Sequence, residues 1–123
     1  MVTENKPGRI DERTFEFALG IVALHRYLTA KKEYVMSKQI LRSGTSVGAN
    51  VHEAQAAQTK KDFITKMAIA SKEIRETNYW LRLLDRANLL HEFPGRESIL
   101  NESTELINIL SKIVKTAQEN IVK

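Results

Sequence analysis

The sequence has no cysteine and little proline or glycine, with two prolines and five glycines among 123 residues. Without cysteine, the chain can form neither disulfide bonds nor thiolate metal sites, and it has no thiol nucleophile. This composition fits a reducing compartment. The prolines and glycines are confined to a few places, which favours long uninterrupted elements of secondary structure.

The chain also has no long hydrophobic run. Its apolar segment at residues 17–24 is well short of the ~20 apolar residues that a membrane-spanning helix needs. Acidic residues precede this segment, where a signal peptide would be positively charged. We therefore expect a cytoplasmic protein with no membrane partner. A formal net charge of +4 permits binding to a polyanion without requiring it.

Hydrophobic residues instead recur at steps of three and four in four separate segments, which is the spacing of amphipathic helices. The predicted helices span about 10–29, 38–58, 60–90 and 97–121. Ser37 is expected to cap the second helix and Thr59 the third. The pattern predicts an all-α fold, an antiparallel up-down-up-down four-helix bundle. It forms a single domain over residues 1–123, with a flexible tail at residues 1–9.

The first predicted helix has a wider apolar face than one bundle position requires. Two lines run along it at helical spacing: Phe17, Ile21, Leu24 and Leu28, and beside them Phe15, Leu19, Val22 and Arg26. The third predicted helix adds Tyr79, Trp80 and Leu83 outside its own apolar line. Soluble monomers rarely expose contiguous apolar patches. We therefore expect the protein to self-associate, with Trp80 in the contact.

Small residues fill the middle of the second predicted helix, at positions 43–49 (SGTSVGA). One interpretation is a loop that divides the region into two short helices. The other is a continuous helix whose small face lets a neighbouring helix approach closely. Gly44 and Gly48 would cost such a helix about 2 kcal/mol relative to alanine. The apolar spacing from Ile40 to Ala54 continues through the segment and favours the helix.

A recognisable pattern covers the second and third predicted helices. It consists of residues 39–54 (QILRSGTSVGANVHEA), 62–64 (DFI), 70–73 (ASKE), 76–77 (ET) and 79–84 (YWLRLL). This pattern resembles the bacterial four-helix bundle protein family, which includes proteins encoded in intervening sequences of large-subunit ribosomal RNA genes. The family looks related to the accessory protein of diversity-generating retroelements. The resemblance, over about residues 10–120, implies a homopentameric ring that contacts RNA, and no known catalytic residue.

Patterns of catalytic or metal-binding residues are weak. The three histidines fall on different elements, and none follows a glutamate by three residues as a di-iron bundle requires. The hydroxyl residues at 43–46 suit a packing face better than a nucleophile beside His52. Gly44 and Gly48 lack the ending of a phosphate-binding loop. We expect no cofactor, no metal and no enzymatic activity, the alternative being an active site built between subunits.

The second predicted helix also contains a candidate polar network. Asn50 and Glu53 are three residues apart, so their side chains can touch on a helix. A buried Glu53 would need a cationic partner, either Arg42 of another chain or Lys72 or Arg75 of the third helix. The alternative is a solvated glutamate. The candidates for an oligomer interface or a structural network are Arg42, Gly44, Gly48, Asn50, Glu53 and Trp80.

A basic stripe on the third predicted helix is the best candidate for binding nucleic acid. Steps of three and four place on one face Lys72, Arg75, Tyr79, Arg82 and Arg86. The cations would contact phosphates, and Tyr79 would stack on an unpaired base. The alternative is a solvated face that Glu76 and Asp85 neutralise. We expect a non-enzymatic homo-oligomer that binds RNA or DNA here, or else a scaffold or adaptor that binds another protein and no nucleic acid.

Overall fold

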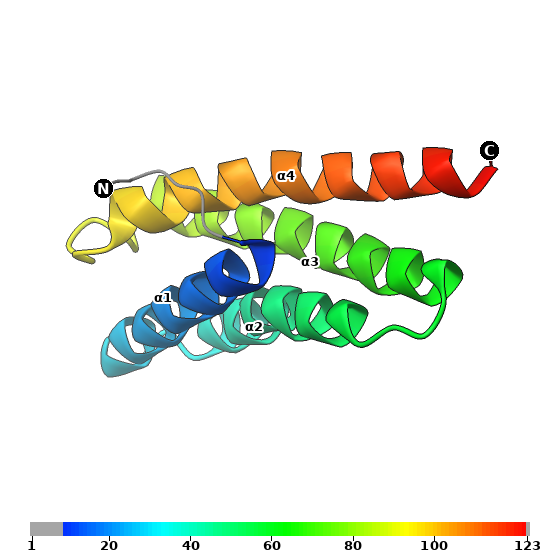
Figure 1. Cartoon of the computed structure of the whole chain (residues 1–123). Helices are drawn as coiled ribbons and strands as arrows, with labels where there is room; N and C mark the ends of the chain where they lie inside the picture. The colour runs from blue at the N-terminus through cyan, green and yellow to red at the C-terminus, as the bar shows by residue number, and fades with distance from the viewer. Residues whose placement is uncertain (1–8, 123) are drawn as a thin grey trace, which may run out of the picture.

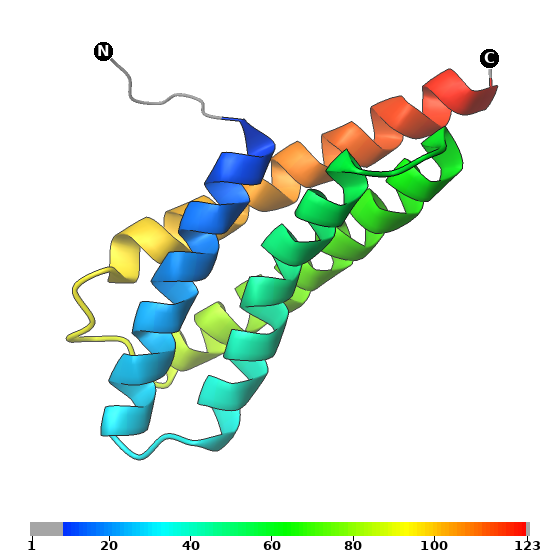
Figure 2. The ribbon, with the colours of Figure 1, turned by 60° about the horizontal axis from the view of Figure 1, so that its bottom comes forward.

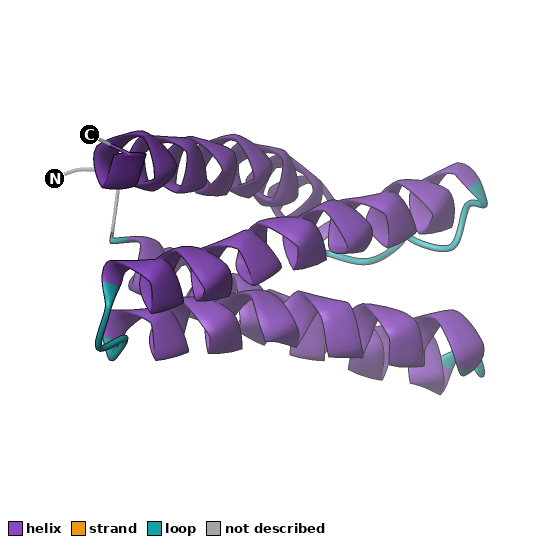
Figure 3. Cartoon of the chain, turned by 90° about the vertical axis from the view of Figure 1, so that its right-hand side faces the viewer, coloured by secondary structure: helices purple, strands orange, loops and turns teal. Residues whose placement is uncertain are grey.

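The structure is a computed structural model that describes residues 9–122. Its helices are α1 (Ile10–Ala30), α2 (Val35–Gln55), α3 (Lys60–Arg86) and α4 (Arg96–Val122). Consecutive helices run antiparallel and are joined by short turns (Figure 1). Between residues 9 and 122 the chain forms no strand (Figure 3). The predicted four helices are confirmed, whereas the predicted tail lies outside the described residues apart from Arg9.

Each helix packs on its neighbours in sequence, α1 on α2, α2 on α3 and α3 on α4, while α4 makes a smaller contact with α1. Helices α1 and α3 are therefore a diagonal pair across the core. Helix α1 begins about midway along the molecule, so the end of α2, the start of α3 and the end of α4 extend past it (Figures 1 and 2). None of the described helices combines the length and apolarity needed to cross a membrane.

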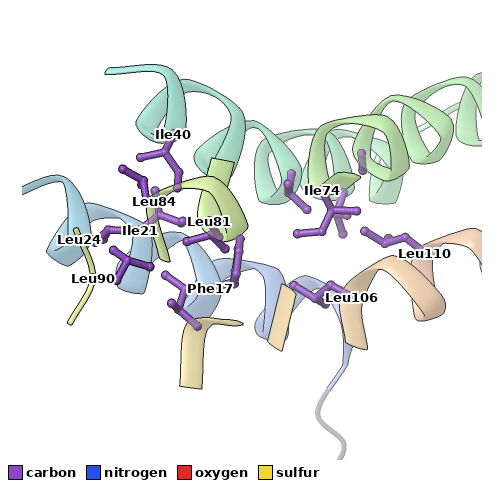
Figure 4. Close-up of a cluster of buried hydrophobic side chains, with 14 of the residues drawn as sticks. Phe17, Ile21, Leu24, Ile40, Ile74, Leu81, Leu84, Leu90, Leu106 and Leu110 are labelled. Carbon is purple, nitrogen blue, oxygen red and sulfur yellow. The ribbon is translucent and has the colours of Figure 1, made fainter. Parts of the chain in front are cut away.

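The core is an apolar column to which all four helices contribute. Figure 4 shows its main side chains, which include Phe17, Ile21, Leu24, Ile40, Ile74, Leu81, Leu84, Leu106 and Leu110. Most of these are fully buried, and burial of each such side chain stabilises the fold by about 1.5–3 kcal/mol. Of the two apolar lines on α1, the one from Phe17 to Leu28 lies in this core. The other line faces outward, where Phe15 is 63% exposed and Leu19 51% exposed.

The small-residue segment at positions 43–49 is helical throughout, so the hypothesis of a continuous helix is confirmed and the loop alternative is wrong. The glycines allow α1 and α2 to approach closely. A Cβ atom at position 44 would lie 2.6 Å from Cγ1 of Ile21. At position 48 it would lie 3.1 Å from the backbone oxygen of Thr14. Close packing against α1 therefore offsets the low helix propensity of these glycines.

Helix α2 begins and ends about three residues before the predicted bounds. It starts at Val35, so Ser37 lies inside the first turn and is not the N-cap. The Ser37 side chain is buried, and its hydroxyl donates a hydrogen bond to the carbonyl of Tyr34 at 3.0 Å. A serine can bond the carbonyl one turn back as readily as it caps a helix, and here it does the former.

Helix α3 begins as predicted and ends four residues early. The Thr59 hydroxyl accepts a hydrogen bond from the backbone N–H of Asp62 at 3.0 Å, which confirms the predicted cap. At the other end, Asn88 adopts a left-handed backbone conformation with φ 64°, and the N–H of Leu89 bonds the carbonyl of Leu84. This capping geometry stops the helix. Leu90, in the connection that follows α3, is fully buried.

Candidate nucleic-acid interface

The outward face of α3 carries the basic stripe. Its members are all exposed to solvent: Lys72, Arg75, Tyr79, Arg82 and Arg86. The buried line on the opposite side of α3, which includes Ile74 and Leu81, fixes this orientation. The ends of the stripe, Lys72 and Arg86, are fourteen positions apart in the sequence, which corresponds to roughly 21 Å along the helix. The structure thus brings the five residues together on one accessible surface.

The two acidic residues expected to neutralise the stripe are engaged elsewhere. Glu76 pairs with the guanidinium of Arg42, and it accepts a hydrogen bond from the indole N–H of Trp80 at 3.1 Å. These two contacts hold the pKa of Glu76 below its ordinary value of 4.5, and the contact with Arg42 has the larger effect. Asp85 accepts two hydrogen bonds from Arg96, at 2.7 and 3.2 Å. Both carboxylates therefore already have cationic partners outside the stripe.

The cations of the stripe make no comparably close contact with a carboxylate among residues 9–122, although Lys72 is near enough to Glu76 to help lower the pKa of that carboxyl. In the part of the chain that the structure describes, no ion pair includes a cation of the stripe. Arg75 donates a hydrogen bond to the hydroxyl of Ser111 on α4 at 2.8 Å, which directs its side chain towards α4. Tyr79 is 57% exposed, and its ring contacts Trp80 edge to face at 5.4 Å. The stripe thus presents unpaired positive charge around an accessible aromatic ring.

Trp80 and Arg42 belong to a cluster that links α2 to α3 within one chain. The guanidinium of Arg42 pairs with Glu76 and, at 3.3 Å, with Glu73. Its side chain is 52% exposed. Trp80 is half-buried beside it on α3. The expected role of Trp80 in a contact between chains stays a prediction.

The proposed contact between Asn50 and Glu53 does not form. The Asn50 amide instead donates to the carbonyl of Ser46, one turn back on α2, at 2.9 Å. Glu53 is exposed, and it pairs with Lys66 of α3 at 2.8 Å. Lys66 holds the pKa of this carboxyl below its usual value. The interpretation of Glu53 as a buried network residue is wrong, because it lies on the outer edge of α2 where α3 can reach it.

Sequence reasoning missed the main polar contact between α1 and α4. Arg13 donates to both oxygens of Glu102, at 2.9 and 2.6 Å, and to Glu105 at 2.7 Å. These carboxylates raise the pKa of Arg13 further above its already high value, so it stays charged. The spacing of Glu102 and Glu105 by three residues was a signal of paired carboxylates on one helical face. Nothing in the local sequence pointed from them to Arg13.

The three histidines lie apart in the fold. His25 is half-buried on α1, His52 is exposed on α2, and His91 is exposed in the turn after α3. Among residues 9–122, no group of three or more histidine, aspartate or glutamate side chains is placed to hold a metal ion. The hydroxyls of Ser43 and Thr77 are buried and lie 2.9 Å apart, where they link α2 to α3.

Comparisons with known proteins agree with this architecture. The family model described as 23S rRNA-intervening sequence protein matches residues 9–112. A crystal structure of a protein of unknown function from the S23 ribosomal protein family of Bacteroides thetaiotaomicron is 50% identical in sequence, with a TM-score of 0.81. The match covers 87% of this chain and 99% of that chain. No curated protein matches. The chain therefore belongs to the family of 23S rRNA-intervening sequence proteins.

Proposed function

We propose that the protein is a non-enzymatic RNA-binding protein whose ligand contacts the outward face of α3. One observation carries the proposal: the cations of the stripe have no carboxylate partner among the described residues, while Glu76 and Asp85 are held by Arg42 and Arg96. The family description refers to 23S rRNA intervening sequences, which fits an RNA ligand but names none.

Phosphate contacts would supply most of the affinity. Cations that neutralise phosphates release condensed counterions, so the logarithm of the affinity falls linearly with the logarithm of the salt concentration. The exposed ring of Tyr79 lies among the cations and offers a stacking surface for an unpaired base. Bases in RNA loops and single strands are open to such stacking, whereas duplex bases are not. The preferred ligand is therefore RNA with unpaired segments.

A triple substitution tests this proposal. Arg75→Gln, Arg82→Gln and Arg86→Gln together should leave the helical circular dichroism signal unchanged and abolish the mobility shift of a stem-loop RNA at low salt. The slope of log affinity against log salt should fall by about 2, since roughly 0.7 is lost per contact with a single strand. The matched control replaces three exposed lysines on other segments, Lys32, Lys38 and Lys112, with Gln.

The control removes the same charge and should retain most of the binding. Equal losses in both variants would indicate attraction by net charge alone and would remove the α3 face from the proposal. If the unmodified protein shows no salt-sensitive binding to RNA or DNA at micromolar concentration, the proposal fails. The alternative function, a scaffold or adaptor for another protein, then replaces it.

A homopentameric ring is the second part of the proposal. It is supported by the family resemblance and by the exposed apolar side chains on α1 and α3. Light scattering should give a mass of about 70 kDa, five times the 14.0 kDa of one chain. A native mass of 14.0 kDa at micromolar concentration would exclude self-association.

A further inference from the structure

Two exposed apolar patches lie on helices that are diagonal across the core. On α1, Phe15 is 63% exposed and Leu19 51% exposed. On α3, Tyr79 is 57% exposed and Leu83 39% exposed. Each patch is an aromatic residue followed four positions later by leucine, so its two side chains are neighbours on the helix surface. Because α1 and α3 are diagonal across the core and both pack on α2, their outer faces lie on opposite sides of the bundle.

The charges around the two patches are opposite in sign. On α1, Glu12 and Glu16 flank Phe15; both are exposed, and neither forms an ion pair with another described residue. On α3, Arg82 and Arg86 flank Leu83 and are likewise exposed and unpaired among the described residues. An apolar patch rimmed by acids thus stands opposite an apolar patch rimmed by bases. Complementary rims of this kind favour docking of one surface on the other and disfavour docking on itself.

The spacing within each patch also matches. The acidic quartet is Glu12, Phe15, Glu16 and Leu19, and the basic quartet is Tyr79, Arg82, Leu83 and Arg86. Each occupies positions i, i+3, i+4 and i+7, which cover two turns of one helical face. When the two helices are laid antiparallel, Glu12 meets Arg86 at one end and Leu19 meets Tyr79 at the other. The centre then holds two apolar side chains, one acid and one base.

We propose that the acidic quartet of one copy docks antiparallel on the basic quartet of a second copy. Each copy uses a different surface towards each neighbour, so the contact is head-to-tail and generates a closed ring or an open chain. The contact covers Tyr79 and pairs Arg82 and Arg86 with glutamates. It therefore uses the same face of α3 as the proposed RNA ligand, and, on the basis of that proposed function, RNA and a second copy compete for it.

Two double variants test the two surfaces one at a time without changing the charge of the protein. Phe15→Ser with Leu19→Ser removes the acidic quartet's apolar centre, and Tyr79→Ser with Leu83→Ser removes that of the basic quartet. Each variant alone should be a folded monomer of 14.0 kDa by light scattering. An equimolar mixture should form a heterodimer of about 28 kDa and nothing larger, because each copy retains one complementary surface. The control is Tyr34→Ser with Val35→Ser, an exposed pair at the start of α2 that should leave assembly unchanged.

Three results would overturn the docking model. The first is that either variant keeps the native mass. The second is that the mixture stays monomeric although both variants are folded, and the third is that the control dissociates as they do. Charge exchange tests the orientation: Glu12→Arg should weaken assembly, and adding Arg86→Glu in the same chain should restore it. Failure of the second substitution to restore assembly would exclude the antiparallel arrangement.

The competition between RNA and a second copy for the outward face of α3 is tested by a separate measurement. Adding a stem-loop RNA to the unmodified protein should lower the mass of the protein assembly, and the monomeric Phe15→Ser, Leu19→Ser variant should bind that RNA at least as tightly. An RNA-bound assembly of unchanged size would refute the competition while leaving the docking surfaces in place. If neither protein binds RNA, the proposed function fails, and the mixing experiment still decides the docking.

Discussion

Helix α1 is held along its two edges by contacts of different kinds. Towards α2, Gly44 and Gly48 remove side-chain bulk, and the helices meet at van der Waals distance. Towards α4 the contact is smaller, and its main polar feature is the pairing of Arg13 with Glu102 and Glu105. Close packing depends on shape and tolerates no added atom, whereas an ion pair tolerates displacement but weakens in salt. The two edges should therefore respond to different perturbations.

The largest effect is expected from added bulk at the α1–α2 edge. Gly44→Leu should lower the free energy of unfolding by about 3 kcal/mol through overpacking, although leucine is the better helix former. The reason is that Ile21 already lies within 3 Å of where the first added carbon would sit. Urea denaturation measures the change, and Ala49→Leu on the exposed side of α2 is the control, which should be neutral or mildly stabilising. A melting temperature raised by Gly44→Leu would contradict this account.

A smaller effect is expected at the α1–α4 edge. Arg13→Met keeps much of the side chain's volume and leaves Glu102 and Glu105 without their cation, so it should cost about 1 kcal/mol. The loss should shrink in 1 M salt, unlike the loss at Gly44. Arg9→Met removes the exposed ion pair between Arg9, the residue before α1, and Asp11 in its first turn, and it should give no measurable change. A cost for Arg13→Met that is independent of salt would show that packing, not charge, closes this edge.

The smallest effect concerns the α2–α3 edge, which combines both kinds of contact. Because Arg42 and Trp80 hold the pKa of Glu76 below 4.5 in the folded state, this carboxylate favours folding above that pH. Its contribution is lost as the pH falls below 4.5 towards the folded-state pKa. Glu76→Gln should therefore melt below the unmodified protein at pH 7, and the difference should diminish at pH 3. Melting curves at both pH values test this, and a difference that grows in acid would exclude it.

The four helices could be predicted because each has an unbroken apolar line, and the boundary errors have local causes. Ser37 offered the same side-chain chemistry as an N-cap, but its hydroxyl bonds the carbonyl of Tyr34 inside the helix. Asn88 could have been recognised as the end of α3, since asparagine tolerates the left-handed conformation better than most residues. The apolar residues after Asn88 continue the helical spacing of α3, so the spacing alone did not indicate that the helix ends there.

The stripe on α3 could be predicted from spacing, but its electrostatic state could not. Whether Glu76 and Asp85 neutralise the stripe depends on their partners, which are Arg42 on α2 and Arg96 at the start of α4. Those pairings follow from how far one helix is shifted along the next, and apolar periodicity leaves that shift undetermined. The same limit explains why Lys66 was not predicted as the partner of Glu53.

The sparse contact between α1 and α4 has a consequence for how the chain opens and closes. All the larger contacts join helices that are adjacent in sequence, so most of the fold can form without closing a long loop. The α1–α4 edge joins the first helix to the last, and it should close late in folding. In the native state the α1–α2 hairpin should detach from α4 as one cooperative unit, with its glycine contact intact. Amide hydrogens on the side of α4 that faces α1 would then exchange with solvent quickly. Amide hydrogens of α2 and α3, on the sides where these two helices pack on each other, would exchange more slowly.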